Sequence, residues 1–176
     1  PLESYDSESS SEFQQDRNLH FKNDIFEVAF GVEINFINYK MGDISKFPYS
    51  PYLFFEVAYF HMNPKAEYNG EWYELQTLGT EGQGTSLTTE NQYPLGQLAI
   101  PVGVGFRMNL TKSIGLSLEY GVRKTFTDYI DDVSGSYVES DILAQENGAL
   151  SAILADQSLS GQKMAGMQRG NGGNND

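Results

Sequence analysis

The stretch Phe26-Glu27-Val28-Ala29-Phe30-Gly31-Val32-Glu33-Ile34-Asn35-Phe36 alternates between two kinds of residue. Every even position carries a bulky apolar side chain, and the odd positions carry only glutamate, alanine, glycine and asparagine. Successive side chains of a β-strand point to opposite faces of its sheet. The stretch 26–36 is therefore predicted to be a strand with one bulky apolar face and one small or charged face.

Three further segments, 52–62, 97–108 and 114–126, repeat this alternation. The pattern is weakest in 52–62, because Phe54 and Phe60 share a face with Glu56 and Ala58. Within 97–108, Pro101 lacks the N–H of a ladder hydrogen bond, which predicts a β-bulge. We expect antiparallel strands joined by a tight turn at 109–113, an intermediate connection at 39–51 and a long loop at 63–96.

The small face of these strands indicates which way they are turned. Its glycines and alanines suit a crowded barrel interior better than water. Its charges are of both signs, and we predict that they form an ion-pair network in the lumen, comprising Glu27, Glu33, Glu56, Arg107, Glu119 and Arg123. Strands of this length, tilted by about 45°, cross about 25 Å, the height of the apolar band of outer-membrane barrels. The sequence therefore predicts an all-β fold, an antiparallel transmembrane β-barrel of a bacterial outer membrane with its bulky faces in lipid.

Loop lengths predict the orientation of this barrel, because short turns face the periplasm and long loops face outward. The connections 39–51 and 109–113 are then periplasmic, and we expect a contact surface there, comprising Ile44, Phe47, Tyr49, Asn109 and Lys112. Four strands cannot close a barrel, since the smallest kind has about eight. We expect this sequence to lack strands on both flanks of an eight-stranded barrel.

The chain divides into three predicted parts. Residues 1–17 are rich in Ser, Glu and Asp and are expected to form an acidic loop or arm. Residues 18–139 hold the barrel strands and loops. Residues 140–176 are expected to form a short helix over 140–156, capped by Ser140, and a flexible Gly/Asn/Gln-rich tail without means of packing.

Composition and motifs argue against several classes of function. The net charge of −13 disfavours nucleic-acid partners, which need clusters of Lys and Arg. No run approaches the roughly 18 apolar residues of a transmembrane helix. The sequence contains no cysteine that could join His20 or His61 in a zinc site. Asp128, Asp131 and Asp132 lack the spacing of a calcium-binding loop. We predict no catalytic site, no cofactor and no metal.

Two segments carry a family resemblance: Asn63-Pro-Lys-Ala-Glu-Tyr-Asn-Gly-Glu-Trp-Tyr-Glu-Leu-Gln-Thr-Leu-Gly-Thr-Glu-Gly-Gln-Gly84 and Arg123-Lys-Thr-Phe-Thr-Asp-Tyr-Ile-Asp-Asp-Val-Ser-Gly-Ser-Tyr137. Both resemble the PorG family, the outer-membrane barrel component of the Bacteroidetes type IX secretion system. The resemblance extends over about 18–156. It implies an integral outer-membrane protein that contacts the periplasmic ring proteins PorK and PorN and takes part in protein secretion and gliding motility.

Two alternatives belong to other functional classes. The charged lumen could serve a small transport or ligand-binding outer-membrane barrel. The alternation also fits a soluble β-barrel that binds an apolar ligand, with its bulky residues turned inward. The leading expectation is a structural barrel that anchors periplasmic components of the secretion machinery.

Overall fold

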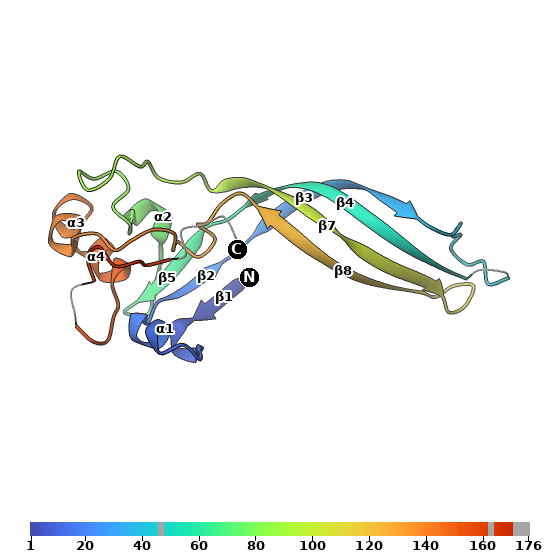
Figure 1. Ribbon diagram of the computed structural model, residues 1–176, viewed down its shortest axis with the longest axis horizontal. Coiled ribbons are helices and arrows are strands. Elements are labelled where there is room, and N and C mark those ends of the chain that lie inside the picture. Colours follow the sequence, from blue (N-terminus) through green and yellow to red (C-terminus); the bar gives the residue numbers. More distant parts are fainter. Residues whose placement is uncertain (46–47, 162–163, 171–176) are drawn as a thin grey trace. The chain divides into compact units, whose positions relative to one another are not determined.

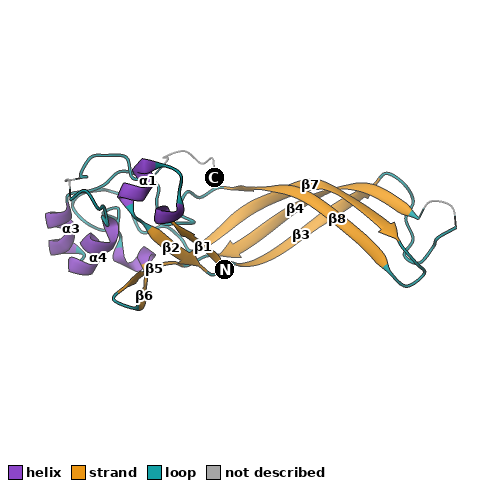
Figure 2. Ribbon diagram, turned by 90° about the horizontal axis from the view of Figure 1, so that it is seen from below, coloured by secondary structure: helices purple, strands orange, loops and turns teal. Residues whose placement is uncertain are grey.

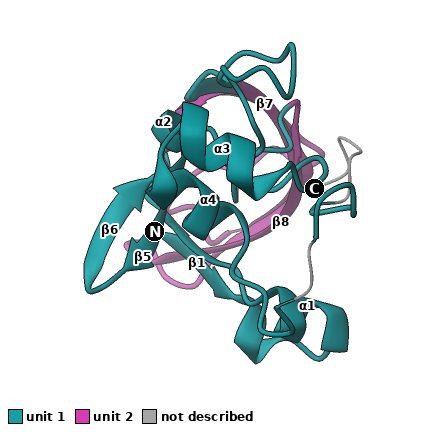
Figure 3. Cartoon of the chain, turned by 90° about the vertical axis from the view of Figure 1, so that its left-hand side faces the viewer, with its two compact units in different colours: residues 1–26, 61–97, 127–176 teal, residues 27–60, 98–126 magenta. Residues whose placement is uncertain are grey.

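The computed structural model describes residues 1–45, 48–161 and 164–170. The chain forms two compact units (Figure 3). The long-sheet unit comprises Glu27–Phe60 and Leu98–Phe126, and the mixed unit comprises Pro1–Phe26, His61–Gln97 and Thr127–Asp176. The mixed unit is thus assembled from segments that precede, interrupt and follow the predicted strands.

The long-sheet unit is built from four strands, β3 (Phe26–Asn35), β4 (Tyr49–His61), β7 (Gly96–Asn109) and β8 (Gly115–Thr125), which Figure 1 shows as long, twisted ribbons. They lie in the order β3-β4-β7-β8. These bounds confirm the four strands predicted from alternation to within a few residues. β3 and β8 are the two ends of this order, so the described strands form a curved sheet and not a closed barrel.

The pairing of β7 with β8 is regular from Ala99↔Thr125 to Asn109↔Gly115. Pro101 pairs with Arg123 within this register, and no residue is skipped on either strand. The predicted bulge at Pro101 is therefore wrong for this ladder. Successive residues of a strand direct their N–H groups to opposite neighbours, so a single proline need not interrupt the pairing on both sides.

A second, shorter sheet lies in the mixed unit, where a long loop and an acidic arm were expected. It contains β1 (Leu2–Tyr5), β2 (His20–Asn23), β5 (Pro64–Tyr68) and β6 (Glu71–Glu74), in the order β1-β2-β5-β6. All three pairings are antiparallel. Asn69 and Gly70 join β5 to β6 with φ of 54° and 83°. Positive φ at both turn residues is the geometry that an Asn-Gly hairpin favours.

The helices are short and belong to the mixed unit (Figure 2). They are the 3-10 helix η1 (Asp6–Glu8), α1 (Glu12–Arg17), α2 (Leu75–Leu78), α3 (Ser140–Glu146) and α4 (Ala149–Ala155). The apolar core of this unit joins β5, α2 and α4 through Ala66, Leu75 and Leu154. Among the described residues, no helix is long and apolar enough to span a membrane.

Three expectations for the chain's outer parts need correction. Residues 1–17 were expected to form an acidic loop or arm, but they hold β1, η1 and α1. This segment is fixed by Asp6, which is buried and accepts hydrogen bonds from Arg17 and from the N–H of Leu19. The predicted helix over 140–156 is two helices, separated at Gly148, whose φ of 96° breaks helical geometry. The tail packs over 164–170, where Met164 and Arg169 are buried. The rest of the predicted tail, at 162–163 and 171–176, lies outside the described residues.

Candidate functional site

The outer face of the long sheet is apolar and exposed along all four strands. On β3, Phe26, Phe30 and Ile34 are 72%, 79% and 60% exposed, and on β8 Tyr120 is 76% exposed. The other large exposed side chains of this face are Val28, Val32, Leu53, Phe55, Val57, Tyr59, Leu98, Val102, Val104, Phe106, Leu116, Leu118 and Val122. Soluble monomers rarely expose a contiguous apolar patch larger than a few hundred Å². This face therefore differs from the surface of a typical soluble monomer.

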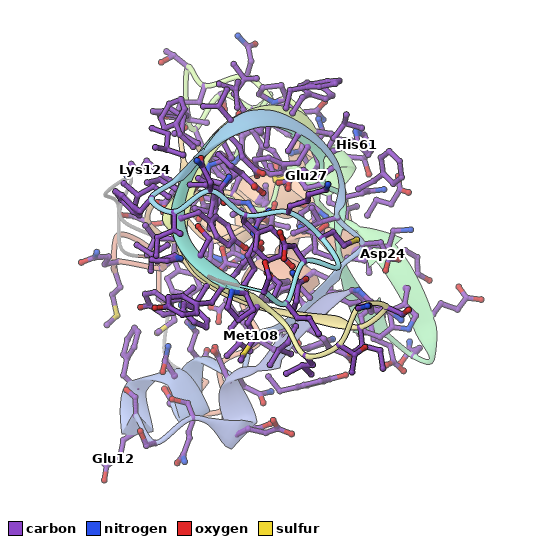
Figure 4. All side chains as sticks on the ribbon, turned by 90° about the vertical axis from the view of Figure 1, so that its right-hand side faces the viewer. Glu12, Asp24, Glu27, His61, Met108 and Lys124 are labelled. Carbon is purple, nitrogen blue, oxygen red and sulfur yellow. The ribbon has the colours of Figure 1, made fainter. Side chains whose placement is uncertain are left out.

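The inner face carries two ion pairs that connect strands distant in the sheet order. Arg107 on β7 pairs with Glu33 on β3 at 2.5 Å, and Arg123 on β8 pairs with Glu27 on β3 at 2.9 Å. Since β3 and β8 are the two ends of the sheet, the second pair shows that the sheet curls until its ends face each other. Figure 4 shows Glu27 on the inner side of this curved ribbon. Four of the six predicted lumen charges are thus brought together as pairs.

Glu56 and Glu119 are the remaining two predicted lumen charges. Among the described residues, neither has a salt-bridge partner. Glu119 accepts a hydrogen bond from the Tyr52 hydroxyl, and Glu56 lies over Gly31. Both carboxylates line a hollow of about 240 Å³ in the inner face, together with Glu33, Phe54 and Arg123. The predicted network is therefore two separate pairs and two further acids.

Aromatic rings of β4 fill the inner face where β7 and β8 have glycine. Tyr52 is 1% exposed and lies over Gly105, where an added Cβ would meet the Tyr52 ring at 2.1 Å. Phe54 covers Gly103 and Gly121 in the same way, at 2.6 Å and 2.7 Å. The guanidinium of Arg107 stacks on Tyr52, 3.9 Å from the ring centroid. The glycines at positions 103, 105 and 121 are explained by this close approach of rings to backbone.

The fit between Tyr52 and Gly105 gives a testable consequence. We expect Gly105→Ala to destabilise the protein by about 1–3 kcal/mol, because the buried Tyr52 ring is held by Ser117 and Glu119 and cannot move aside. Gly115→Ala is the matched control, since the nearest atom to its added Cβ is 3.4 Å away. Urea unfolding of the two variants measures the difference. Equal losses would contradict the assigned packing.

The turn end of the long sheet is organised by Asn109. Its Nδ2 donates to the carbonyl oxygens of Lys40 and Asp43, both at 2.9 Å, and its Oδ1 accepts from the Tyr39 hydroxyl at 2.5 Å. Asn109 is 5% exposed because its amide is engaged by these hydrogen bonds, and its predicted contact with a partner stays a prediction. It holds the segment 40–43 of the first connection against the end of β7, where the turn 110–114 begins. Burial of its amide is sustained by these hydrogen bonds.

The other predicted contact residues have different surroundings. Ile44 is 47% exposed, and two further apolar side chains of these connections, Met41 and Leu110, are 79% and 54% exposed. Tyr49 stacks on Phe106 with ring centroids 5.9 Å apart, and Lys112 is exposed. Phe47 lies outside the described residues. We define the turn surface as Met41, Ile44 and Leu110.

A buried polar cluster in the mixed unit was missed by the sequence analysis. Arg169, 3% exposed, pairs with Glu81 at 3.3 Å and lies 3.8 Å from the Asp132 carboxylate. Asp132 accepts hydrogen bonds from the hydroxyls of Thr80 and Tyr93. Three stretches of chain, 80–93, 128–135 and 164–170, are held together by this cluster. No local pattern reveals it, because Arg169 stands in a Gly-rich segment that resembles a flexible tail.

The electrostatics of this cluster follow from two buried acids sharing one arginine. Burial raises the pKa of the Asp132 carboxyl to about 6, against the opposing effects of Arg169 and the Thr80 hydroxyl. The pKa of the Tyr93 hydroxyl is raised by burial and by the neighbouring Asp132. Asp132 also has a φ of 64°, a left-handed conformation that is uncommon outside glycine. The cluster is consequently a tightly constrained junction between segments.

Candidate metal ligands do not gather in the described part of the chain. No group of three or more His, Asp or Glu side chains there could hold a metal ion. His20 accepts a hydrogen bond from the N–H of Glu67 at 2.9 Å and stacks on Tyr5, so it has a structural role in the short sheet. Asp132, considered above for calcium, belongs to the arginine cluster.

Comparison with known families places the chain. A family model described as Domain of unknown function (DUF6089) matches residues 1–147. The chain belongs to the DUF6089 family. The DUF6089 match covers both sheets and α3, and therefore both the apolar outer face and the paired inner face. No curated protein matches the chain, and no solved structure matches it.

Proposed function

We propose that the long sheet is part of a transmembrane β-barrel of a bacterial outer membrane, and that this barrel anchors periplasmic components of a type IX secretion system. One observation carries the first half of this proposal. The outer face exposes large apolar side chains on every strand, whereas the inner face holds ion pairs and close-packed rings. This arrangement is the reverse of a water-soluble sheet, in which the charges face outward.

The energetics favour lipid over water for the outer face. Each Å² of apolar surface left in water forgoes about 25 cal/mol, and some seventeen large side chains are exposed on this face. Lys124, near the end of β8, is the single charged residue among the outward positions of the four strands. Strands of 10 to 14 residues match the length needed to cross an outer membrane with a tilt of about 45°.

The connections support an orientation for this barrel. The two short connections, 36–48 and 110–114, leave the sheet at the end opposite to the long segment 62–95, which enters the mixed unit. Short turns of outer-membrane barrels face the periplasm, and long loops face outward. The turn surface is then periplasmic, and the mixed unit is an extracellular fold.

The anchoring role rests on the resemblance of 63–84 and 123–137 to the PorG family and on the form of the turn surface. Met41, Ile44 and Leu110 are exposed apolar side chains on connections that Asn109 fixes in place. Preorganised apolar side chains are suited to docking, because little ordering entropy is lost on binding. The expected partners are the periplasmic ring proteins PorK and PorN.

Copurification tests this role. We expect Ile44→Asp to weaken capture of PorK and PorN roughly tenfold or more, because it places a charge in the apolar contact, while the protein stays in the outer membrane. Ile153→Asp, on the exposed face of α4 in the mixed unit, is the matched control and should capture them normally. Normal capture by Ile44→Asp would exclude the turn surface. Absence of the unaltered protein from outer-membrane fractions would exclude the barrel itself.

A further inference from the structure

The two end strands of the long sheet each lack a second neighbour among the described residues. Within the ranges that the structure describes, β3 pairs with β4 alone and β8 pairs with β7 alone. In lipid, the unpaired N–H and C=O groups of such an edge have no water with which to form hydrogen bonds. If the proposed barrel is correct, further strands must therefore pair with the outer edges of β3 and β8.

The inner face of the sheet constrains what those strands carry. Its charged residues are Glu27, Glu33, Glu56, Glu119, Arg107 and Arg123, a surplus of two acids over bases. Both arginines are engaged with Glu33 and Glu27. The surplus lies at Glu56 and Glu119, which line the hollow of about 240 Å³ beside Arg123. Arg123 is already paired with Glu27, and Glu119 accepts a hydrogen bond from the Tyr52 hydroxyl but has no cation as partner in the described part of the chain. A narrow barrel interior that excludes water does not tolerate lone carboxylates, whereas paired ones are accommodated.

We infer that the strands which complete the barrel beside β3 and β8 direct lysine or arginine side chains into this hollow, where they pair with Glu56 and Glu119. This inference rests on the proposed function. The charge balance also selects the source of the strands. A second copy of this sheet would bring the same surplus of acids, so the completing strands differ in sequence from β3, β4, β7 and β8.

Replacing Glu56 and Glu119 by glutamine tests this inference, because the sign of the change in stability depends on whether cations fill the hollow. If cationic side chains fill the hollow, Glu56→Gln combined with Glu119→Gln leaves those cations unpaired. We expect a roughly tenfold or larger fall in the ratio of folded to unfolded protein, measured by urea titration of the protein in its native membrane. Glu67→Gln, at an exposed position of β5, is the control and should leave the ratio unchanged. If no cations fill the hollow, removing the two uncompensated acids relieves their repulsion. A ratio that stays constant or rises in the double variant therefore overturns the inference.

Cross-linking identifies the strands independently of stability. The photoreactive residue p-benzoylphenylalanine replaces Val28 on β3 or Leu118 on β8, and the linked peptides are sequenced. We expect peptides of a different sequence that carry Lys or Arg at alternating positions. Linked peptides from β3 or β8 of a second copy, linked strands without basic residues, or no linked strand at all would each overturn the inference. Loss of the unaltered protein from the outer membrane would instead contradict the proposed barrel.

Discussion

Replacing Phe30 by arginine is expected to destabilise the folded protein in a bilayer by about 2–4 kcal/mol, the effect of a cation at the bilayer midplane of a barrel. Phe30 lies near the middle of β3 and is 79% exposed on the outer face. In water the same substitution would remove an already exposed side chain, and its effect would stay within about 0.5 kcal/mol. The two environments thus predict effects that differ severalfold for one substitution.

Depth along the strand supplies the control for this prediction. Phe26 begins β3 on the same face and is 72% exposed, so Phe26→Arg should cost only about 0–1 kcal/mol near the membrane interface. Val102→Arg, near the middle of β7, should behave like Phe30→Arg. Urea midpoints of the reconstituted protein measure all three. Equal effects at Phe26 and Phe30 would argue against a membrane-spanning sheet.

The long sheet could be predicted because its signal is local. Alternation in 26–36 depends only on neighbours in sequence, and it determined both the strand and the face on which Glu27 and Glu33 lie. The same alternation in the segments 97–108 and 114–126 placed Arg107 and Arg123 on the inner face, where the structure shows them paired with those glutamates. Which acid pairs with which base depends on curvature, which alternation does not encode.

The mixed unit could not be predicted in the same way, because its contacts are distant in sequence. Arg169 pairs with Glu81, 88 residues earlier, and β1 pairs with β2 across η1 and α1. Composition alone made 1–17 and 161–176 resemble solvated segments. One signal was available and unused, since the dipeptide Asn69-Gly70 favours a two-residue hairpin turn. Asn109 was placed at the correct end of the sheet but assigned to the surface, because burial of a turn residue leaves no trace in a short polar segment.

The second large effect is expected at the buried cluster of the mixed unit. Arg169→Met should destabilise this unit by about 3–5 kcal/mol, because it leaves the carboxylates of Glu81 and Asp132 buried without a cation. Hydrogen exchange at the amides of Ser134 and Gly135, which donate to Glu81, reports this loss. Lys65→Met removes a partly exposed pair with Glu74 at 3.6 Å and is the control, with an expected loss of about 0–1 kcal/mol.

The pH dependence of the Arg169→Met loss separates electrostatics from packing. The pKa of Asp132 is raised to about 6, so this group alone favours the folded state most at acid pH, and its contribution falls as the pH rises through about 6. Without Arg169, which lowers that pKa, Asp132 holds its proton to still higher pH. Below a pH of about 6 the Asp132 carboxyl is largely neutral in both proteins. The variant then leaves one buried carboxylate fewer without a cation than it does at higher pH. The loss should therefore be smaller at pH 5 than at pH 8, whereas a loss from packing alone would be the same at both.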